Sequence, residues 1–166
     1  LLAMKQSAEE TVRTEMAFLQ AQIKPHFLFN ALNTIAALAL DKPQMTYDLL
    51  LELGKYLRSS FDFGNRDKLT TLSRELELVE AYLFIEKARF GDRLQVAYDV
   101  EEEADCSLPP LAIQPLVENA VRHGVMKRWS GGTVTVIVRS TERETVIRIR
   151  DNGEGMSREK LATVFE

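Results

Sequence analysis

The chain has 166 residues, of which 45% are hydrophobic and 28% are charged, so it can bury one good core or two small ones. Its formal net charge is −4 with both signs interspersed, which argues against direct nucleic-acid binding. Cys106 is the only cysteine, which excludes an intrachain disulfide and fits a reducing compartment. No apolar run is long enough to span a bilayer, and no signal peptide is visible. The sequence starts in a helical pattern and stops abruptly at Glu166, so we expect it to be part of a longer protein.

The first half of the chain has the periodicity of amphipathic helices. The first helix is predicted to end near Leu40, and its apolar stripe comprises Leu19, Ile23, Phe27, Ala31, Ile35 and Leu38. A second helix follows Asp41, with an apolar stripe that comprises Met45, Leu49, Leu53, Tyr56, Leu57 and Phe61. Two such helices cannot bury both stripes alone. We therefore expect an antiparallel hairpin that pairs with a second copy as a four-helix bundle.

The second half mixes helices and strands. A polar turn at residues 63–67 precedes a helix predicted from Ser73, its N-cap, to Phe90. A strand at 94–100, a helix that reaches about His123, and two strands at 133–138 and 145–149 follow. We therefore divide the chain into an all-α domain at residues 1–68 and an α+β domain at residues 69–166.

The sequence KPHFLFNALNTI at residues 24–35 places a histidine directly behind a proline in the first helix. Imidazole is neutral and nucleophilic near physiological pH, so His26 could accept a phosphoryl group. Asn30, one turn later, shares its flank of the helix. The alternative is a structural histidine, with Pro25 simply kinking the helix. This segment alone does not decide between the two.

A second candidate site lies on the predicted helix before Gly124. Its spacing puts Asn119, Arg122 and His123 on one side of that helix. The residues expected to face the core are Ile113, Leu116, Val117, Ala120 and Val121. An amide oxygen suits Mg²⁺ that bridges phosphates, and the two basic side chains can contact those phosphates. An ordinary polar surface is the alternative interpretation.

The sequence DNGEGM at residues 151–156 directly follows the last predicted strand. The carboxylate of Asp151 could accept a hydrogen bond from an adenine amino group, and Gly153 and Gly155 would let a ligand approach the backbone. Turns of this kind also end strands that bind nothing. The order of an asparagine-bearing helix, two strands and then this turn favours a nucleotide site.

Together these segments resemble the catalytic core of bacterial sensor histidine kinases, in particular the autolysin-sensor-like class that signals to response regulators with LytTR DNA-binding domains. Residues 24–35 resemble its phosphoacceptor box, and AYLFIEKARFGDRL at 81–94 resembles the helix that leads into its ATP-binding domain. LPPLAIQPLVENAVRHG at 108–124 is similar to its N box, and DNGEGM to its first glycine box.

The resemblance implies a helical dimerisation and histidine-phosphotransfer domain, followed by a Bergerat-type ATP-binding α/β sandwich. It implies ATP and Mg²⁺ as cofactors, with His26 accepting the γ-phosphoryl group and Asn119 binding Mg²⁺. Arg122 and His123 would lie near the phosphates. Asp151 would bind the adenine amino group, on a wall shaped by Gly153 and Gly155. Asn30 matches a position where related kinases hold a polar residue that orients a water for dephosphorylation of the partner regulator.

The same resemblance implies the function and the partners. It predicts ATP-dependent autophosphorylation of His26 and transfer to an aspartate of a response regulator. The partners would be a second copy and a LytTR-type regulator, with no direct contact to nucleic acid. The chain would be the cytoplasmic part of a protein anchored in the membrane through segments outside it. The alternatives are a non-catalytic dimeric signalling module with the kinase fold, and an ATPase or serine kinase, which has no reason to carry the His26 helix.

Three departures from the family pattern stand out. Phe27 occupies the position that is acidic in better-known histidine kinases, so another partner must orient His26 unless its neutral tautomer suffices. Pro115 lies four residues before Asn119, where several related ATPases have a base, and we do not assign the adjacent Glu118 as one. The second glycine box and the ATP lid would follow Phe165, so we expect weak or no ATP binding from the chain as given.

Overall fold

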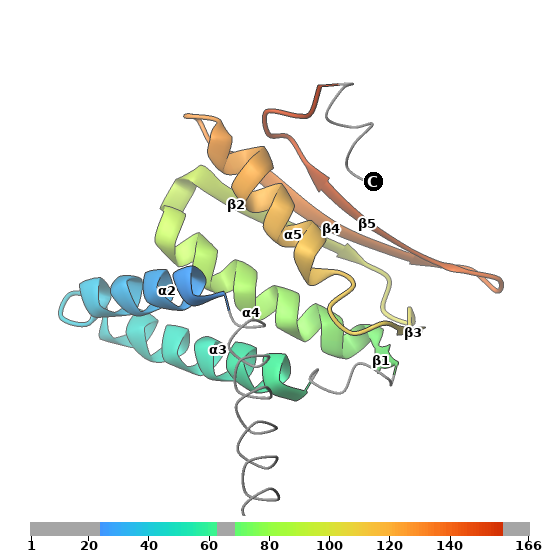
Figure 1. Cartoon of the computed structure of the whole chain (residues 1–166), viewed down its shortest axis with the longest axis horizontal. Helices are drawn as coiled ribbons and strands as arrows, with labels where there is room; N and C mark the ends of the chain where they lie inside the picture. The colour runs from blue at the N-terminus through green and yellow to red at the C-terminus, as the bar shows by residue number, and fades with distance from the viewer. Residues whose placement is uncertain (1–23, 63–68, 158–166) are drawn as a thin grey trace, which may run out of the picture.

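A computed structural model describes residues 24–62 and 69–157 (Figure 1). The elements are, in chain order, α2 (Pro25–Leu38), α3 (Pro43–Asp62), β1 (Thr70–Thr71), α4 (Leu72–Phe90), η1 (Gly91–Arg93), β2 (Leu94–Val100), β3 (Ser107–Leu108), α5 (Gln114–Asn119), η2 (Ala120–Gly124), η3 (Val125–Lys127), β4 (Gly132–Ser140) and β5 (Thr145–Asp151). The predicted polar turn at residues 63–67 lies outside the described residues, as do Leu19 and Ile23.

Helices α2 and α3 form the predicted hairpin (Figure 1). Pro25 occupies the start of α2, where its missing N–H costs no hydrogen bond. Phe27, Ala31 and Ile35 are buried, which confirms the predicted apolar stripe of this helix. The helix ends at Leu38, and the backbone N–H of Lys42 donates to the Leu38 carbonyl in the short connection to α3.

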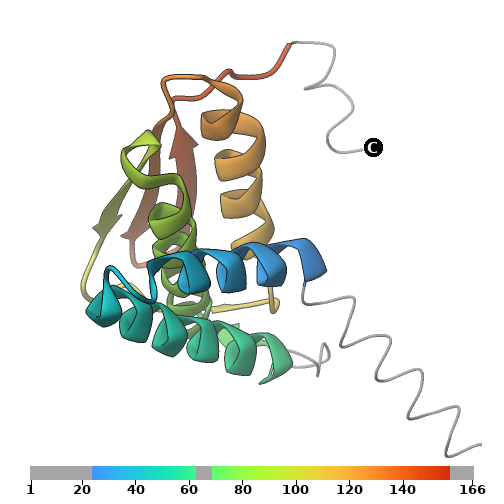
Figure 2. The same ribbon diagram turned by 90° about the vertical axis from the view of Figure 1, so that its left-hand side faces the viewer.

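The apolar face of α3 is covered by α4 of the same chain (Figures 1 and 2). Leu49, Leu53 and Tyr56 are buried there, whereas Met45 and Phe61 at the two ends of the predicted stripe are exposed. The prediction that a second copy covers this face was therefore wrong. The periodicity of a helix identifies its buried face but not the element that covers it.

The N-cap of helix α4 lies two residues before the predicted one. Thr71, not Ser73, is the N-cap, and its hydroxyl oxygen accepts the backbone N–H of Arg74 at 3.4 Å. Thr71 belongs to β1, which pairs antiparallel with β3, so the helix starts where this short ladder ends. At the other end, Gly91 adopts φ +58°, a conformation in which glycine carries little strain.

The predicted strands form one three-stranded sheet in the order β2-β4-β5. Strand β2 pairs parallel with β4, and β4 pairs antiparallel with β5. Val134, Val136 and Val138 alternate along β4 and are fully buried, since α4 and α5 cover one face of the sheet (Figure 2). Strand β2 has the predicted bounds, while β4 and β5 extend beyond theirs. The expectation of helices followed by an α/β region is confirmed at this level.

The start of α5 is tied to α4 by a buried carboxylate. Glu75 has no exposed surface, and its two oxygens accept the backbone N–H groups of Leu111 at 2.6 Å and Ile113 at 3.0 Å. Leu111 has φ +60°, which is uncommon for a residue with a side chain. These two hydrogen bonds therefore fix both the position and the bend of the segment that leads into α5.

The lone cysteine and the lengths of the helices can be compared with the sequence expectations. Cys106 is a free, half-buried thiol. Among the helices within residues 24–62 and 69–157, none combines the length and the apolar character needed to cross a bilayer.

We predict that Glu75→Ala lowers the free energy of unfolding by about 2–4 kcal/mol, because it leaves two buried N–H groups without their charged acceptor. Glu77→Ala is the matched control, since Glu77 is exposed on the same helix, and it should change stability by less than about 0.5 kcal/mol. Urea denaturation followed by circular dichroism measures both. Equal effects of the two substitutions would contradict the role assigned to Glu75.

Candidate functional site

His26 is the second residue of α2, and its imidazole is exposed. The side-chain nitrogen Nδ2 of Asn30 lies 3.1 Å from Nδ1 of the ring and 3.4 Å from Nε2. The amide N–H donates to a ring nitrogen that carries a lone pair. The structure thus brings these two predicted residues together on the solvent side of the helix.

A cavity of about 190 Å³ opens beside His26, where α2 meets α4 and the segment formed by α5 and η2. Phe27 and Tyr82 contribute apolar walls. The charged residues in its lining are Lys24, Glu86, Arg89, Glu118 and Arg122. Residues nearly a hundred positions apart in the sequence therefore share one cavity with the candidate phosphoacceptor.

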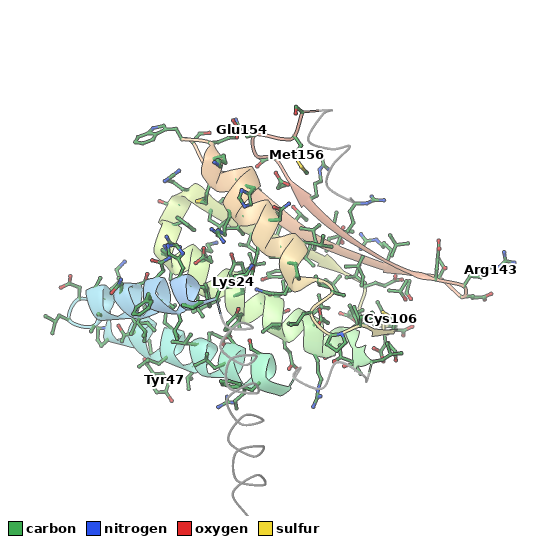
Figure 3. All side chains as sticks on the ribbon, viewed as in Figure 1. Lys24, Tyr47, Cys106, Arg143, Glu154 and Met156 are labelled. Carbon is green, nitrogen blue, oxygen red and sulfur yellow. The ribbon has the colours of Figure 1, made fainter. Side chains whose placement is uncertain are left out.

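The two carboxylates of this cavity are each paired with a cation. Glu118 is buried and forms an ion pair with Lys24, the residue just before α2 (Figure 3). Its other oxygen accepts the side-chain N–H of Gln114 at 3.2 Å. Glu86 is buried and pairs with Arg89 at 3.4 Å.

Burial and the nearby positive charge change the ionisation of these groups. Burial, with Arg122 close by, lowers the pKa of Lys24. Burial also raises the pKa of Glu86. Arg122 forms no ion pair or hydrogen bond within the described part of the chain, although its positive charge opposes the rise in the pKa of Glu86, so its guanidinium can bind an anion.

The second predicted group lies where α5 ends and η2 begins. Asn119 is the last residue of α5, and Arg122 and His123 belong to η2, a π-helical turn. All three side chains are exposed. The backbone N–H of Val125 bonds to the carbonyls of both Ala120 and Val121, which marks the widening of the helix here. Such π turns are frequent at functional sites.

One predicted core residue of this helix is misplaced. Leu116 is 55% exposed, while Ile113, Val117, Ala120 and Val121 are buried as predicted. The buried face is shifted because Gln114 and Glu118 lie inside and bond to each other. The sequence analysis assigned only apolar residues to the core, and nothing in the local pattern indicated that Gln114 and Glu118 are buried together.

The third predicted group surrounds the end of β5. Asp151 is exposed, and its Oδ1 accepts the backbone N–H of Gly153 at 2.9 Å. A Cβ added to Gly124 would overlap that carboxylate, and one added to Gly153 would overlap the backbone of Gly124. The N–H of Glu154 donates to the Gly124 carbonyl at 3.2 Å. Close approach of η2 to the DNGEGM turn therefore requires glycine at both positions.

The remaining glycine of this turn faces open space. Gly155 has φ +77°, and nothing lies within 4 Å of where its Cβ would be. Asn152 anchors the turn to β4, since its Oδ1 accepts the backbone N–H of Thr133 at 2.7 Å. Arg128 donates to the Asn152 carbonyl at 2.6 Å. The backbone at Gly155 is therefore exposed beside the Asp151 carboxylate, and the contacts of Asn152 with Thr133 and Arg128 fix the turn to the rest of the fold.

Comparison with protein families identifies both halves of this arrangement. Residues 14–94 match the histidine kinase family, and residues 108–166 match the family described as histidine kinase-, DNA gyrase B-, and HSP90-like ATPases. The chain belongs to the histidine kinases. This confirms the resemblance drawn from the motifs. The family matched by the second half implies that this kinase core binds ATP.

Relatives of this kinase core come from several bacteria. It is 47% identical over 171 residues to YwpD of Bacillus subtilis, with 100% of the chain and 62% of that protein aligned. It is 40% identical to the sensor histidine kinase YpdA of Escherichia coli (92% and 27% aligned). It is 39% identical to the sensor histidine kinase/phosphatase LytS of Staphylococcus aureus (92% and 26% aligned). The chain thus spans about a quarter of the two named kinases.

The geometry also adds residues that motif reasoning missed. Lys24 and Glu118 join α2 to α5, and Gly124 packs directly against Asp151. Gly124 could have been suspected as the last residue of the N-box motif, but its close contact with Asp151 is visible only in the fold. Within residues 24–62 and 69–157, Asn119 and His123 form no side-chain hydrogen bond or ion pair.

We predict that Gly124→Ala weakens ATP binding at least tenfold, since the added methyl group must displace Asp151 and such overpacking costs about 1–3 kcal/mol. Gly54→Ala is the control, because its Cβ would meet only the end of Arg58 at 3.8 Å. It should leave ATP affinity unchanged. Calorimetric titration of the full-length protein with ATP measures both, and unchanged affinity in Gly124→Ala would refute this role of the glycine.

Proposed function

We propose that this chain is the catalytic core of a sensor histidine kinase that transfers the γ-phosphoryl group of ATP to His26 and then to an aspartate of a response regulator. The observation that carries the proposal is the cavity that His26 shares with Arg122. Arg122 belongs to the same π turn as Gly124, which packs against the Asp151 turn. The short segment η2 would thus lie beside both the acceptor His26 and the proposed nucleotide-binding wall.

His26 would act as the nucleophile. Its exposed ring can present a lone pair to a phosphorus atom, and Asn30 can hold its orientation through the amide contact. Phosphoryl transfer depends mainly on positioning and on charge neutralisation, so the chain has little covalent chemistry of its own to perform. Asn30 is also suited to orient a water molecule for dephosphorylation, a role that fits the phosphatase in the name of the Staphylococcus aureus relative.

The nucleotide-binding residues follow from the wall around β5. Asp151 would accept the adenine amino group, with Gly153 and Gly155 leaving the backbone open to the ring. Arg122 and His123 would contact the phosphates. Asn119 offers one exposed amide oxygen to Mg²⁺, an ion that usually takes few protein ligands and keeps phosphates and waters. When bound, Mg²⁺ would neutralise charge on the phosphates.

A second copy would complete the helical domain at residues 1–68, which packs on α4 of the ATP-binding domain at residues 69–166. The hairpin has an apolar outer face opposite α4, with Phe29, Leu32, Tyr47, Leu50 and Leu51 between 46% and 67% exposed. Tyr47 projects from the outer side of α3 (Figure 3). An apolar face of this kind favours an interface between copies.

The response regulator would be of the LytTR type, and the parent protein a membrane sensor with this chain on its cytoplasmic side. Relatives named as sensor proteins support this, since about three quarters of the length of YpdA and LytS lies outside the matched region. That length leaves room for a sensing part.

We predict that the full-length protein, given ATP labelled at the γ-phosphate, acquires label that is labile in acid and stable in base. His26→Gln should abolish it, because no other imidazole lies in this cavity. His123→Gln should retain some label, since the acceptor is intact. Asn119→Ala should abolish labelling while the circular dichroism spectrum stays unchanged. Label that survives His26→Gln would exclude His26 as the acceptor, and a wild-type protein without label would favour a non-catalytic signalling module.

We predict that Leu32→Glu raises the dissociation constant of the dimer at least tenfold, because it buries an unpaired charge in the proposed interface. The fold should survive, since Leu32 is 46% exposed in the single chain. Arg143→Glu, at the exposed tip of the β4–β5 turn (Figure 3), is the control. Light scattering at several concentrations reports the mass, and an unchanged dimer would refute this face.

A further inference from the structure

The phosphoacceptor helix is anchored on the nucleotide-binding half of its own chain. Lys24, two residues before His26, forms its ion pair with Glu118 of α5. Glu118 is only 6% exposed, and Gln114 holds its other oxygen. Lys24 is half exposed, but separating it from Glu118 would leave the buried carboxylate without its cation, so the contact resists separation of α2 from α5.

A second anchor lies on the other side of His26. The ring of Phe27 packs against both Tyr56 and Tyr82, with centroid distances of 4.7 and 5.1 Å. Phe27 is 7% exposed and Tyr82 is 2% exposed. His26 is thus held between an ion pair to α5 and an aromatic contact to α4, and both partners belong to the same chain.

Arg122 lies between the acceptor and the nucleotide wall. It lines the cavity beside His26 and follows Asn119 by three positions. The two carboxylates of the cavity pair with Lys24 and Arg89, and Arg122 forms no ion pair with either within the described chain, although its charge acts on Glu86 from nearby. A free guanidinium beside an imidazole is suited to hold a phosphoryl group by two parallel hydrogen bonds.

We propose that autophosphorylation runs within one chain: Asn119 and Asp151 hold the nucleotide that donates to His26 of the same chain. Arg122 contacts the phosphoryl group on its way, and Lys24 and Glu118 form the positioning pair. A lone pair of the His26 ring forms the new N–P bond. The bond from the γ-phosphorus to the bridging oxygen breaks, its electron pair leaves with ADP, and the ring proton stays on the other nitrogen. This inference rests on the proposed function.

Transfer between chains would require a different arrangement. His26 would have to leave the cavity and reach Arg122 of the other copy, which separates both of its anchors. The outer apolar face of the hairpin, the proposed dimer interface, lies opposite α4 and leaves the cavity undisturbed. Dimerisation through that face is therefore compatible with transfer inside each chain.

Mixed dimers of the full-length protein test the proposal. Two differently tagged copies are co-expressed, purified through both tags in sequence, and incubated with ATP labelled at the γ-phosphate. In one mixed dimer, the first copy carries His26→Gln and the second carries Asn119→Ala, so neither copy has both His26 and Asn119. We expect labelling below about a tenth of the wild-type level, because transfer inside either copy is blocked.

The control dimer pairs a wild-type copy with a copy that carries both substitutions. It should keep about half of the wild-type label, because its intact copy needs nothing from the partner. Wild-type-like label in the dimer of single variants, on the copy that retains His26, would overturn the proposal. Loss of label from the control dimer would also overturn it. A wild-type protein without label would instead refute the proposed function, and this inference with it.

Charge reversal tests the positioning pair separately. Lys24→Glu and Glu118→Lys should each slow labelling of His26 by about tenfold or more, since small misplacements of reacting groups carry penalties of that size. The double reversal should restore most of the rate. ATP affinity should stay unchanged in any variant that folds, as judged by circular dichroism. If the folded double variant does not recover the rate of His26 labelling, Lys24 and Glu118 do not act as a positioning pair.

Discussion

Helix α4 has nine buried residues, and this burial determines how the other elements are placed. The hairpin covers α4 on one side and the sheet and α5 cover it elsewhere, so a single hydrophobic core runs from Phe27 to Val138. Two of the buried residues, Glu75 and Glu86, are acids, and each has donors close by. A helix that is buried this completely cannot tilt without exposing apolar surface to water or separating a buried carboxylate from its donors.

This constraint explains how His26 and the proposed nucleotide-binding wall come within reach of each other. Glu75 fixes the start of α5 against α4, and the aromatic contact of Phe27 with Tyr82 fixes the start of α2 against the same helix. His26 and Arg122 then share a cavity, although α2 and η2, which carry them, lie far apart in the sequence. Phosphoryl transfer depends on positioning, so a shared scaffold of this kind suits it.

The motifs of the candidate site were predictable because each reflects local chemistry. An imidazole behind a proline, an amide beside two basic residues, and a carboxylate followed by glycines can be recognised without knowing what lies around them. The β2 strand was predicted with the observed bounds, since its alternation reflects one covered face. The cap at Thr71 and the shifted face at Leu116 were not, because β1 pairing and a buried Gln114–Glu118 contact override the local preference.

The sequence by itself determined the longer helices and the three strands of the main sheet, the apolar stripe of α2, and which residues carry the candidate chemistry; the short strands β1 and β3 were not predicted. These properties depend on neighbours within one or two turns, where periodicity and side-chain type are sufficient. Only the tertiary structure decided that α4 covers Leu53, that Lys24 forms an ion pair with Glu118, and that Gly124 packs against the Asp151 carboxylate. Such contacts join residues far apart in the chain, and they exist only once burial of apolar surface has brought those segments together.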